Sequence, residues 1–436
     1  MKLPDGANRE AGSVRVILAD TKTGGARQRP RGFRFTRLAA VMLAALLASA
    51  GVIIGVRMAT ASPKVTGKPA TQLDAKSAPA LDATRLVLIG PYVLVDTRTT
   101  GKVKAGGTVD LVAAELPEGA TAVALEVSIL EASAAGVVAI ASAAGPVSVL
   151  RAGRAGVMTS ATAIVPIGED RKLSARSEGG GNLLISLVGA FVPAESATAG
   201  RVVATAPTEV LRLVPRTGGK DARIDLTRVP VLRDAGAYAA VLLQVAADVG
   251  HNGGSLAVGT RPDRLDQRVF WAATSGTDRT RAGFLIVPVD GRAIHLHYQA
   301  GSLLTVDVVG YVTGDDAPKS VAGLVVPVKP ATAEPVKLPA GGNADVAIVS
   351  ADGSDAVPAD RVGAAFVTLS AVGQAVGPVA VHAPDAAPPK NAILSAGGNA
   401  NRQISTLVRA VMGQVRVSTT AGATITVTRQ AIVLTG

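Results

Sequence analysis

The sequence predicts an all-β protein in which three tandem β-sandwich domains, Greek-key or jelly-roll-like, follow a single N-terminal transmembrane helix. Three observations carry this prediction. A run of nineteen uncharged residues occupies 38–56. Beyond residue 84, short bursts of Val, Ile and Leu alternate with turn-forming Gly, Pro, Asp and Asn. Four strand-like segments also recur in the same order, 118 to 124 residues apart.

The apolar run sets the predicted membrane topology. A helix over 38–56 would be roughly 28 Å long, close to the thickness of the hydrocarbon core of a bilayer. The preceding segment carries nine basic residues against three acidic ones, and five arginines lie between Arg27 and Arg37. Because short basic loops stay on the cytoplasmic side, residues 1–37 are predicted to be a cytoplasmic tail, 38–58 to span the plasma membrane, and the rest to lie outside.

A cleaved signal peptide is the alternative interpretation of the same segment. Ala59-Thr60-Ala61 has the small-x-small pattern of a cleavage site, which would fall after Ala61. The apolar run is longer than the usual hydrophobic region of a signal peptide, and 37 leading residues are long for its basic region. The sequence therefore favours a retained anchor.

The net charge of +11 is concentrated near the membrane. The tail accounts for +6 and the neighbouring residues up to 83 for +2, which leaves about +3 for residues 84–436, without a basic stripe. This distribution excludes a nucleic-acid partner. The chain has no cysteine, so disulfides, thiolate chemistry and cysteine metal sites are excluded, and no cofactor is expected.

Residues 59–83 are rich in Pro, Thr, Ser, Ala and Lys, and we expect a flexible linker there. Three β-sandwich domains are then predicted at 84–194, 201–314 and 320–436. The strand VALEVSI at 123–129, for example, returns as VLLQVAA at 241–247 and AFVTLSA at 365–371. The joints at 193–200 and 314–320 are short and polar, which favours a semi-rigid rod, with packing of the repeats around one another as the alternative.

The opening of the first unit, VLVDTRTTGKVKAGGTVDL at 93–111, resembles a repeat module common in exported actinobacterial proteins. In that module a V-D-T-R strand opens the domain and a V-D-V-x-G-Y-like strand closes it. Asp96 and Arg98 match the opening motif in the first unit, and Asp307 and Tyr311 match the closing motif in the second unit. At the opening of the second unit the sequence keeps the arginine of the motif, Arg216, but not its aspartate. The resemblance is weak in the third unit. It implies an envelope-associated, β-rich accessory or binding module and brings no catalytic residues.

Asp96 and Arg98 are two residues apart, so on a strand they would share a face. A structural ion pair or turn bond is the favoured interpretation, and a ligand contact is the alternative.

Catalytic signatures are scarce beyond the membrane. Neither G-x-S-x-G nor G-x-x-x-x-G-K-[ST] occurs there. His295 and His297 would share a strand face and could bind a metal with Asp290 or Asp307, but exposure to solvent around a core-facing Leu296 is the favoured interpretation. Glu126 alternates with apolar residues, as does its counterpart Gln244 in the second repeat, which indicates an outward face.

Aromatic residues are few, which argues against a flat sugar-binding surface. Phe270 and Trp271 are adjacent, so on a strand one side chain would face out and could anchor a partner. That the bulkier ring caps a domain edge is the favoured interpretation.

The sequence thus predicts a non-catalytic, membrane-anchored cell-envelope protein that acts as a scaffold or interaction module for an envelope protein or polymer. A wall- or capsule-polysaccharide-binding module and an enzyme with a divergent metal site near His295 and His297 are the alternatives. The sequence does not select an oligomeric state.

Overall fold

A computed structural model describes residues 81–436, except for 114, 215–218, 234, 250–252, 272–279, 300–302, 350–356, 392 and 398–400. The predicted tail, transmembrane helix and most of the linker lie outside the described residues, as does Arg216. No helix in the described part is both long and apolar enough to span a bilayer. The described residues all belong to one compact unit.

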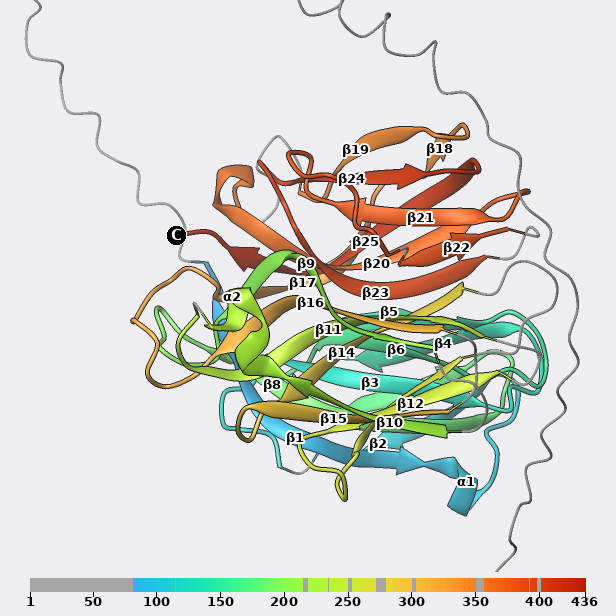
Figure 1. The fold of residues 1–436 in the computed structure, drawn as a ribbon. Coiled ribbons are helices and arrows are strands. Elements are labelled where there is room, and N and C mark those ends of the chain that lie inside the picture. Colours follow the sequence, from blue (N-terminus) through green and yellow to red (C-terminus); the bar gives the residue numbers. More distant parts are fainter. Residues whose placement is uncertain are drawn as a thin grey trace, which may run out of the picture. The chain divides into compact units, whose positions relative to one another are not determined.

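The all-β prediction is confirmed, because nearly every element of this unit is a strand (Figure 1). The first repeat contains β1 (Thr84–Asp96), α1 (Thr97–Thr100), β2 (Gly107–Leu111), β3 (Ala122–Leu130), β4 (Gly136–Ser142), β5 (Gly145–Ala152), β6 (Thr159–Pro166), β7 (Leu173–Ser177) and β8 (Asn182–Pro193).

The second repeat contains β9 (Val202–Leu213), β10 (Gly219–Asp225), η1 (Leu226–Arg228), α2 (Pro230–Arg233), β11 (Tyr238–Asp248), β12 (Gly254–Gly259), β13 (Gln267–Trp271), β14 (Thr280–Pro288), β15 (Ala293–Gln299) and β16 (Leu303–Thr313). The third contains β17 (Val325–Thr332), β18 (Val336–Leu338), β19 (Asn343–Ala347), η2 (Ala359–Arg361), β20 (Val362–Val372), β21 (Gly377–His382), β22 (Leu394–Ala396), β23 (Arg402–Arg409), β24 (Gln414–Thr419) and β25 (Ala423–Leu434).

Each repeat pairs its strands in the same order. In the first, one layer runs β1-β8-β3-β6 and the other β2-β7-β4-β5. Pairing of β1 with β17 makes the first of these layers continuous with the corresponding layer of the third repeat, in one nine-stranded sheet. The second repeat has β9-β16-β11-β14 and β10-β15-β12-β13, and the third has β17-β25-β20-β23 and β19-β24-β21-β22. This is the order of an eight-stranded jelly roll, and β18 is an addition to the third. We call the first sheet of each repeat the inner sheet and the second the outer sheet.

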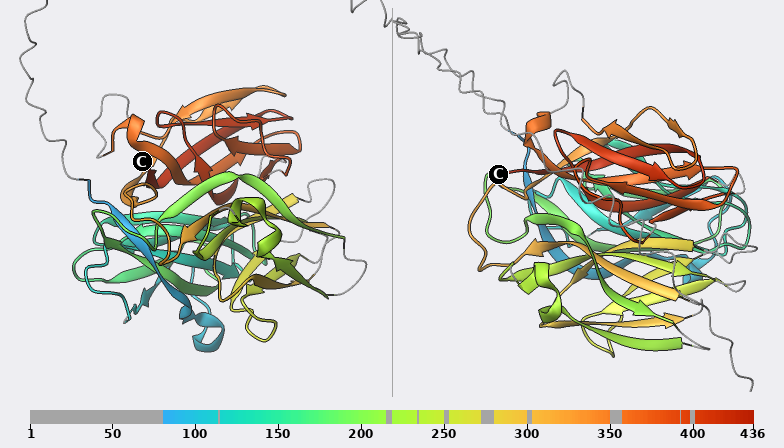
Figure 2. Two further views of the ribbon diagram at one scale, coloured as in Figure 1. Left: turned by 60° about the vertical axis from the view of Figure 1, so that its left-hand side comes forward. Right: turned by 45° about the horizontal axis from the view of Figure 1, so that its top comes forward.

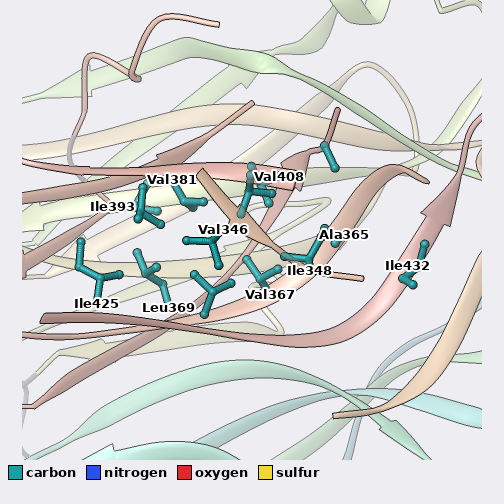
Figure 3. Close-up of a cluster of buried hydrophobic side chains, with 14 of the residues drawn as sticks. Val346, Ile348, Ala365, Val367, Leu369, Val381, Ile393, Val408, Ile425 and Ile432 are labelled. Atoms are coloured by element: carbon teal, nitrogen blue, oxygen red, sulfur yellow. The ribbon is translucent and has the colours of Figure 1, made fainter. Parts of the chain in front are cut away.

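Each sandwich has an apolar core of its own, which we call a private core. In the third repeat, Val367 and Leu369 of β20 meet Val381 of β21 and Ile425 of β25 between the two layers (Figure 3). The strands of this repeat, orange to red, are seen from two further directions in Figure 2. The alternation of inward and outward side chains along each strand produces this arrangement.

A fourth apolar cluster, which we call the shared core, joins the three repeats. It includes Ala124 of β3, Leu242 of β11 and Phe366 of β20, which occupy equivalent places in the three inner sheets. The rings of Phe284 and Phe366, from the second and third repeats, meet edge to face with centroids 6.2 Å apart. The repeats therefore pack around one another, and the expected semi-rigid rod is wrong.

The shared core explains why the central strands are apolar throughout. Every residue of β3 is buried, with Val123 and Leu125 in the private core and Ala122 and Ala124 in the shared core. A strand covered on both faces has no reason to alternate apolar with polar residues.

The joints between repeats are also tied together. Arg201, 7% exposed, donates from Nη1 to the Ala322 carbonyl at 2.9 Å and from Nη2 to the Pro318 carbonyl at 2.7 Å. Gly200 has φ +82°, and a Cβ there would lie 2.4 Å from the Leu86 carbonyl oxygen. Gly323 has the same geometry: its φ is +86°, and a Cβ there would lie 2.7 Å from the Val202 carbonyl oxygen. The polar joints are therefore packed connections between the repeats.

Candidate functional site

Three polar side chains form a row across the second inner sheet. Gln244 of β11 lies opposite Asp307 of β16, which lies opposite Glu209 of β9. Directly opposed residues of antiparallel strands point to the same face. The neighbours of Asp307, Val306 and Val308, belong to the private core of the second repeat. The row therefore points away from that core, towards the third repeat.

The third repeat covers this row with the segment that follows β21. Asn391 donates from Nδ2 to Asp307 Oδ1 at 2.9 Å, to Asp307 Oδ2 at 3.0 Å and to Glu209 Oε2 at 3.1 Å. Ala386 N–H donates to the Ala383 carbonyl at 3.0 Å, which makes a turn at the start of the segment. Two consecutive prolines, Pro388 and Pro389, then restrict the backbone before Asn391.

The two carboxylates of the row differ in their electrostatic environment. Arg212 donates from Nε and Nη2 to Glu209 at 3.0 and 2.6 Å, and this pairing lowers the pKa of the Glu209 carboxyl. Asp307 is only 5% exposed. Burial raises its pKa, although the hydrogen bond from Asn391 opposes the rise. Glu209 is thus an anion paired with Arg212 on the edge strand of the sheet. Asp307 is a buried carboxyl whose hydrogen-bond donor among the described residues is the neutral amide of Asn391.

A cleft of about 530 Å³ opens beside the row, between the second and third repeats. Apolar side chains from both repeats form much of its wall, among them Val309, Val381, Ile393, Leu407 and Val408. His382 also lines it and donates from Nδ1 to the Ala383 carbonyl at 2.9 Å. This volume is within the range of small-molecule sites.

A second unusual carboxyl, Glu126 of β3, occupies the place in the first repeat that Gln244 occupies in the second. Glu126 is 7% exposed, and burial raises its pKa to about 8 against a hydrogen bond from the Arg268 backbone N–H. Among the described residues its Oε1 has no hydrogen-bond partner. The expected outward face is correct only relative to its own sandwich, because the second repeat covers the side chain and leaves it buried.

The structure joins Asp96 and Arg98 in an ion pair at the end of β1. Arg98 donates from Nε to Asp96 Oδ1 at 2.8 Å and from Nη2 to Oδ2. Arg98 lies in the helical turn α1 and not on the strand, so the expectation that both residues share a strand face is wrong. Asp96 also caps that turn by accepting from the Arg98 N–H at 3.1 Å.

Phe270 and Trp271 end strand β13 and face opposite ways. Trp271 is 2% exposed in the private core, donates from Nε1 to the Ala282 carbonyl at 3.1 Å and meets the Tyr298 ring edge to face. Phe270 is half-buried, and its backbone N–H donates to Ser160 Oγ of the first repeat at 2.9 Å. Neither ring offers a flat exposed surface.

His295 and His297 lie half-buried on β15, in the outer sheet of the second repeat, on either side of the fully buried Leu296. His297 Nδ1 lies 2.7 Å from Asp221 Oδ1. Asp307 belongs to the inner sheet and points away from the same private core, so the core of the sandwich separates it from the histidines. The site that would have combined the three is therefore not formed. No cluster of three or more His, Asp or Glu side chains within the described ranges could hold a metal ion.

Tyr311 of β16 is half-buried, and burial raises its pKa while the charge of Arg201 opposes the rise. It packs against the private core of the second repeat.

Sequence reasoning missed Glu209 and Asn391, and it placed Gln244 in solvent. A usable signal was present, because Glu126, Gln244 and Thr368 are polar residues at the same place in three otherwise apolar strands. A polar residue that recurs in strands buried on both faces indicates an interface between repeats. Asn391 carried no such signal, since it comes from an irregular segment of another repeat.

No protein-family model matches the chain, and no curated protein matches it. One similar solved structure is described as showing the triple jelly roll fold and turret assembly in an archaeal virus; it is 11% identical, covers 82% of this chain and 90% of its own, and has a TM-score of 0.16. Another is from Sulfolobus turreted icosahedral virus, with 11% identity, 81% and 90% coverage and a TM-score of 0.15. Likenesses at these TM-scores carry no inference about function.

Proposed function

We propose that this chain is a non-catalytic, single-pass membrane protein of the cell envelope, whose three fused jelly rolls form an interaction platform outside the membrane. The uncharged run at 38–56 and the arginines before it support the anchor and its orientation. The resemblance of 93–111 to a module of exported proteins supports the compartment.

The cleft between the second and third repeats carries the platform role. Both repeats contribute its walls, so neither could form it alone. The shared core holds the repeats together and keeps the two walls in place. In this proposal the transmembrane helix fixes the base, residues 59–83 set the reach, and the cleft recruits an envelope partner at the high effective concentration that tethering provides.

The absence of cysteine allows a direct test with single-cysteine variants. Ser13→Cys labels the tail, Arg228→Cys an 87% exposed side chain of the second repeat, and Lys390→Cys the exposed rim of the cleft. Intact cells are treated with a membrane-impermeant maleimide that carries a benzophenone, and then illuminated. We expect the reagent to label 228 and 390 but to reach 13 only after permeabilisation. We also expect a cross-linked envelope product at 390 in excess over 228.

Labelling of the tail in intact cells would contradict the orientation. A mature chain that has lost residue 13 would contradict the retained anchor. Equal cross-linking at 390 and 228 would contradict the platform role of the cleft.

A further inference from the structure

The Gln244 side chain lines the inner end of the cleft and carries a buried hydrogen-bond acceptor that no described residue uses. It is 3% exposed, lines the cleft, and its Oε1 has no partner among the described residues. The orientation of the amide is set by Nε2, which donates to the Gly283 carbonyl at 2.8 Å. A flipped amide would place two acceptors against each other, so Oε1 is the free atom. A buried acceptor without a donor is costly, so a donor group of a ligand that reached Oε1 would gain a hydrogen bond there.

The neighbouring carboxyl adds to this excess of acceptors. Asn391 Nδ2 carries two hydrogens, yet three oxygens lie within hydrogen-bond distance of it, two of Asp307 and one of Glu209. Arg212 Nη2 is directed to Glu209 Oε2 at 2.6 Å and to Asn391 Oδ1 at 3.3 Å. The inner end of the cleft, at Gln244 and Asp307, therefore presents more acceptors than the surrounding donors fill.

The walls restrict the kind of donor that fits. Val309, Val381 and Leu407 make the space next to the row apolar, so a ligand needs an aliphatic body. An ammonium group supplies three N–H donors and no acceptor, which matches the inner end. Its charge would also compensate the buried carboxyl of Asp307, because an adjacent cation favours the ionised form.

We infer that the cleft between the second and third repeats binds an aliphatic primary amine, with the ammonium between Asp307 and Gln244 Oε1 and the chain along the apolar wall. The amine belongs either to a lysine side chain of a polypeptide or to a free diamine. This inference rests on the platform role of the cleft and is independent of the membrane anchor.

Calorimetric titration of the purified full-length protein in detergent solution tests the inference. The probes are Nα-acetyl-lysine amide, 1,5-diaminopentane, and Nα-acetyl-norleucine amide, which keeps the aliphatic chain and lacks the ammonium. We expect at least one amine to bind saturably and the norleucine compound to bind about tenfold more weakly or worse. Preference for the lysine compound indicates a polypeptide source, and preference for the diamine a free ligand.

Two variants and one control localise the binding. Asp307→Asn keeps the shape of the side chain and its contact with Asn391, and we expect it to weaken amine binding about tenfold or more. Asn391→Lys places an ammonium from the chain itself beside Asp307, and we expect it to block the amine. Asp290→Asn removes an exposed carboxylate of the same repeat and should leave binding unchanged. Unchanged far-ultraviolet circular dichroism, which reports the strands of all three repeats, checks the fold of each variant.

Equal binding of the lysine and norleucine compounds, unaltered affinity in Asp307→Asn, or no saturable binding by either amine would overturn the inference. Because this assay uses purified protein, its failure is distinguishable from an incorrect orientation in the cell labelling.

Discussion

Replacement of Glu126 by glutamine is expected to abolish most of the decline in stability between pH 5 and pH 8. Burial raises the pKa of this carboxyl from 4.5 to about 8, so the folded protein holds a proton that the unfolded chain releases. The stabilisation is complete below pH 4.5 and is lost as the pH rises to about 8. The substituted amide would stay neutral throughout and keep the shape of the protonated acid.

The expected size follows from about 1.4 kcal/mol per pKa unit, which gives roughly 5 kcal/mol across the window as an upper value. Urea denaturation followed by circular dichroism at pH 5, 6, 7 and 8 measures it. Glu169→Gln, at an exposed carboxylate, is the matched control and should run parallel to the wild type. A residual slope in Glu126→Gln is expected from Asp307, whose pKa is also raised by burial. Parallel pH profiles for Glu126→Gln and the wild type would show that Glu126 is not a buried neutral acid.

Phe366→Ala is expected to lower the free energy of unfolding by about 3–5 kcal/mol. The ring is 3% exposed in the shared core and packs edge to face on Phe284 of another repeat. Its removal deletes apolar contacts between the second and third repeats within the shared core and leaves a cavity that the flanking sheets cannot close.

Guanidinium denaturation of the full chain measures this loss. Tyr92→Ala, which removes a 45% exposed ring of β1, is the control and should change stability by no more than about 0.5 kcal/mol. A similar effect of the two substitutions would mean that Phe366 contributes no more than a surface aromatic residue, and the shared core would lose its support.

Much of the fold follows from the sequence. Period-two alternation and regularly spaced turns predict strands, and the recurrence of VALEVSI predicts three similar units. The packing of these units does not follow from the joints, because short polar linkers favour a semi-rigid rod. The information lay in the strands: Ala122 and Ala124 are apolar on the face that an isolated sandwich would turn to water.

The candidate site was harder to predict. Gln244 and Asp307 are far apart in sequence and meet only through strand register, and Asn391 reaches them from another repeat. Motif spacing detects residues close in sequence, as with His295 and His297, which share a face but belong to no group of three possible metal ligands among the described residues. A site built across repeats requires the tertiary arrangement.

The central claim is that the three repeats fold as one unit around a shared core. Trp271 is the only tryptophan of the chain and lies in the private core of the second repeat, so its fluorescence reports that repeat alone. Far-ultraviolet circular dichroism reports the strands of all three. In a single denaturant titration we expect the two signals to change together, with one midpoint. A separate Trp271 transition, with the remaining β signal lost at other denaturant concentrations, would contradict the claim.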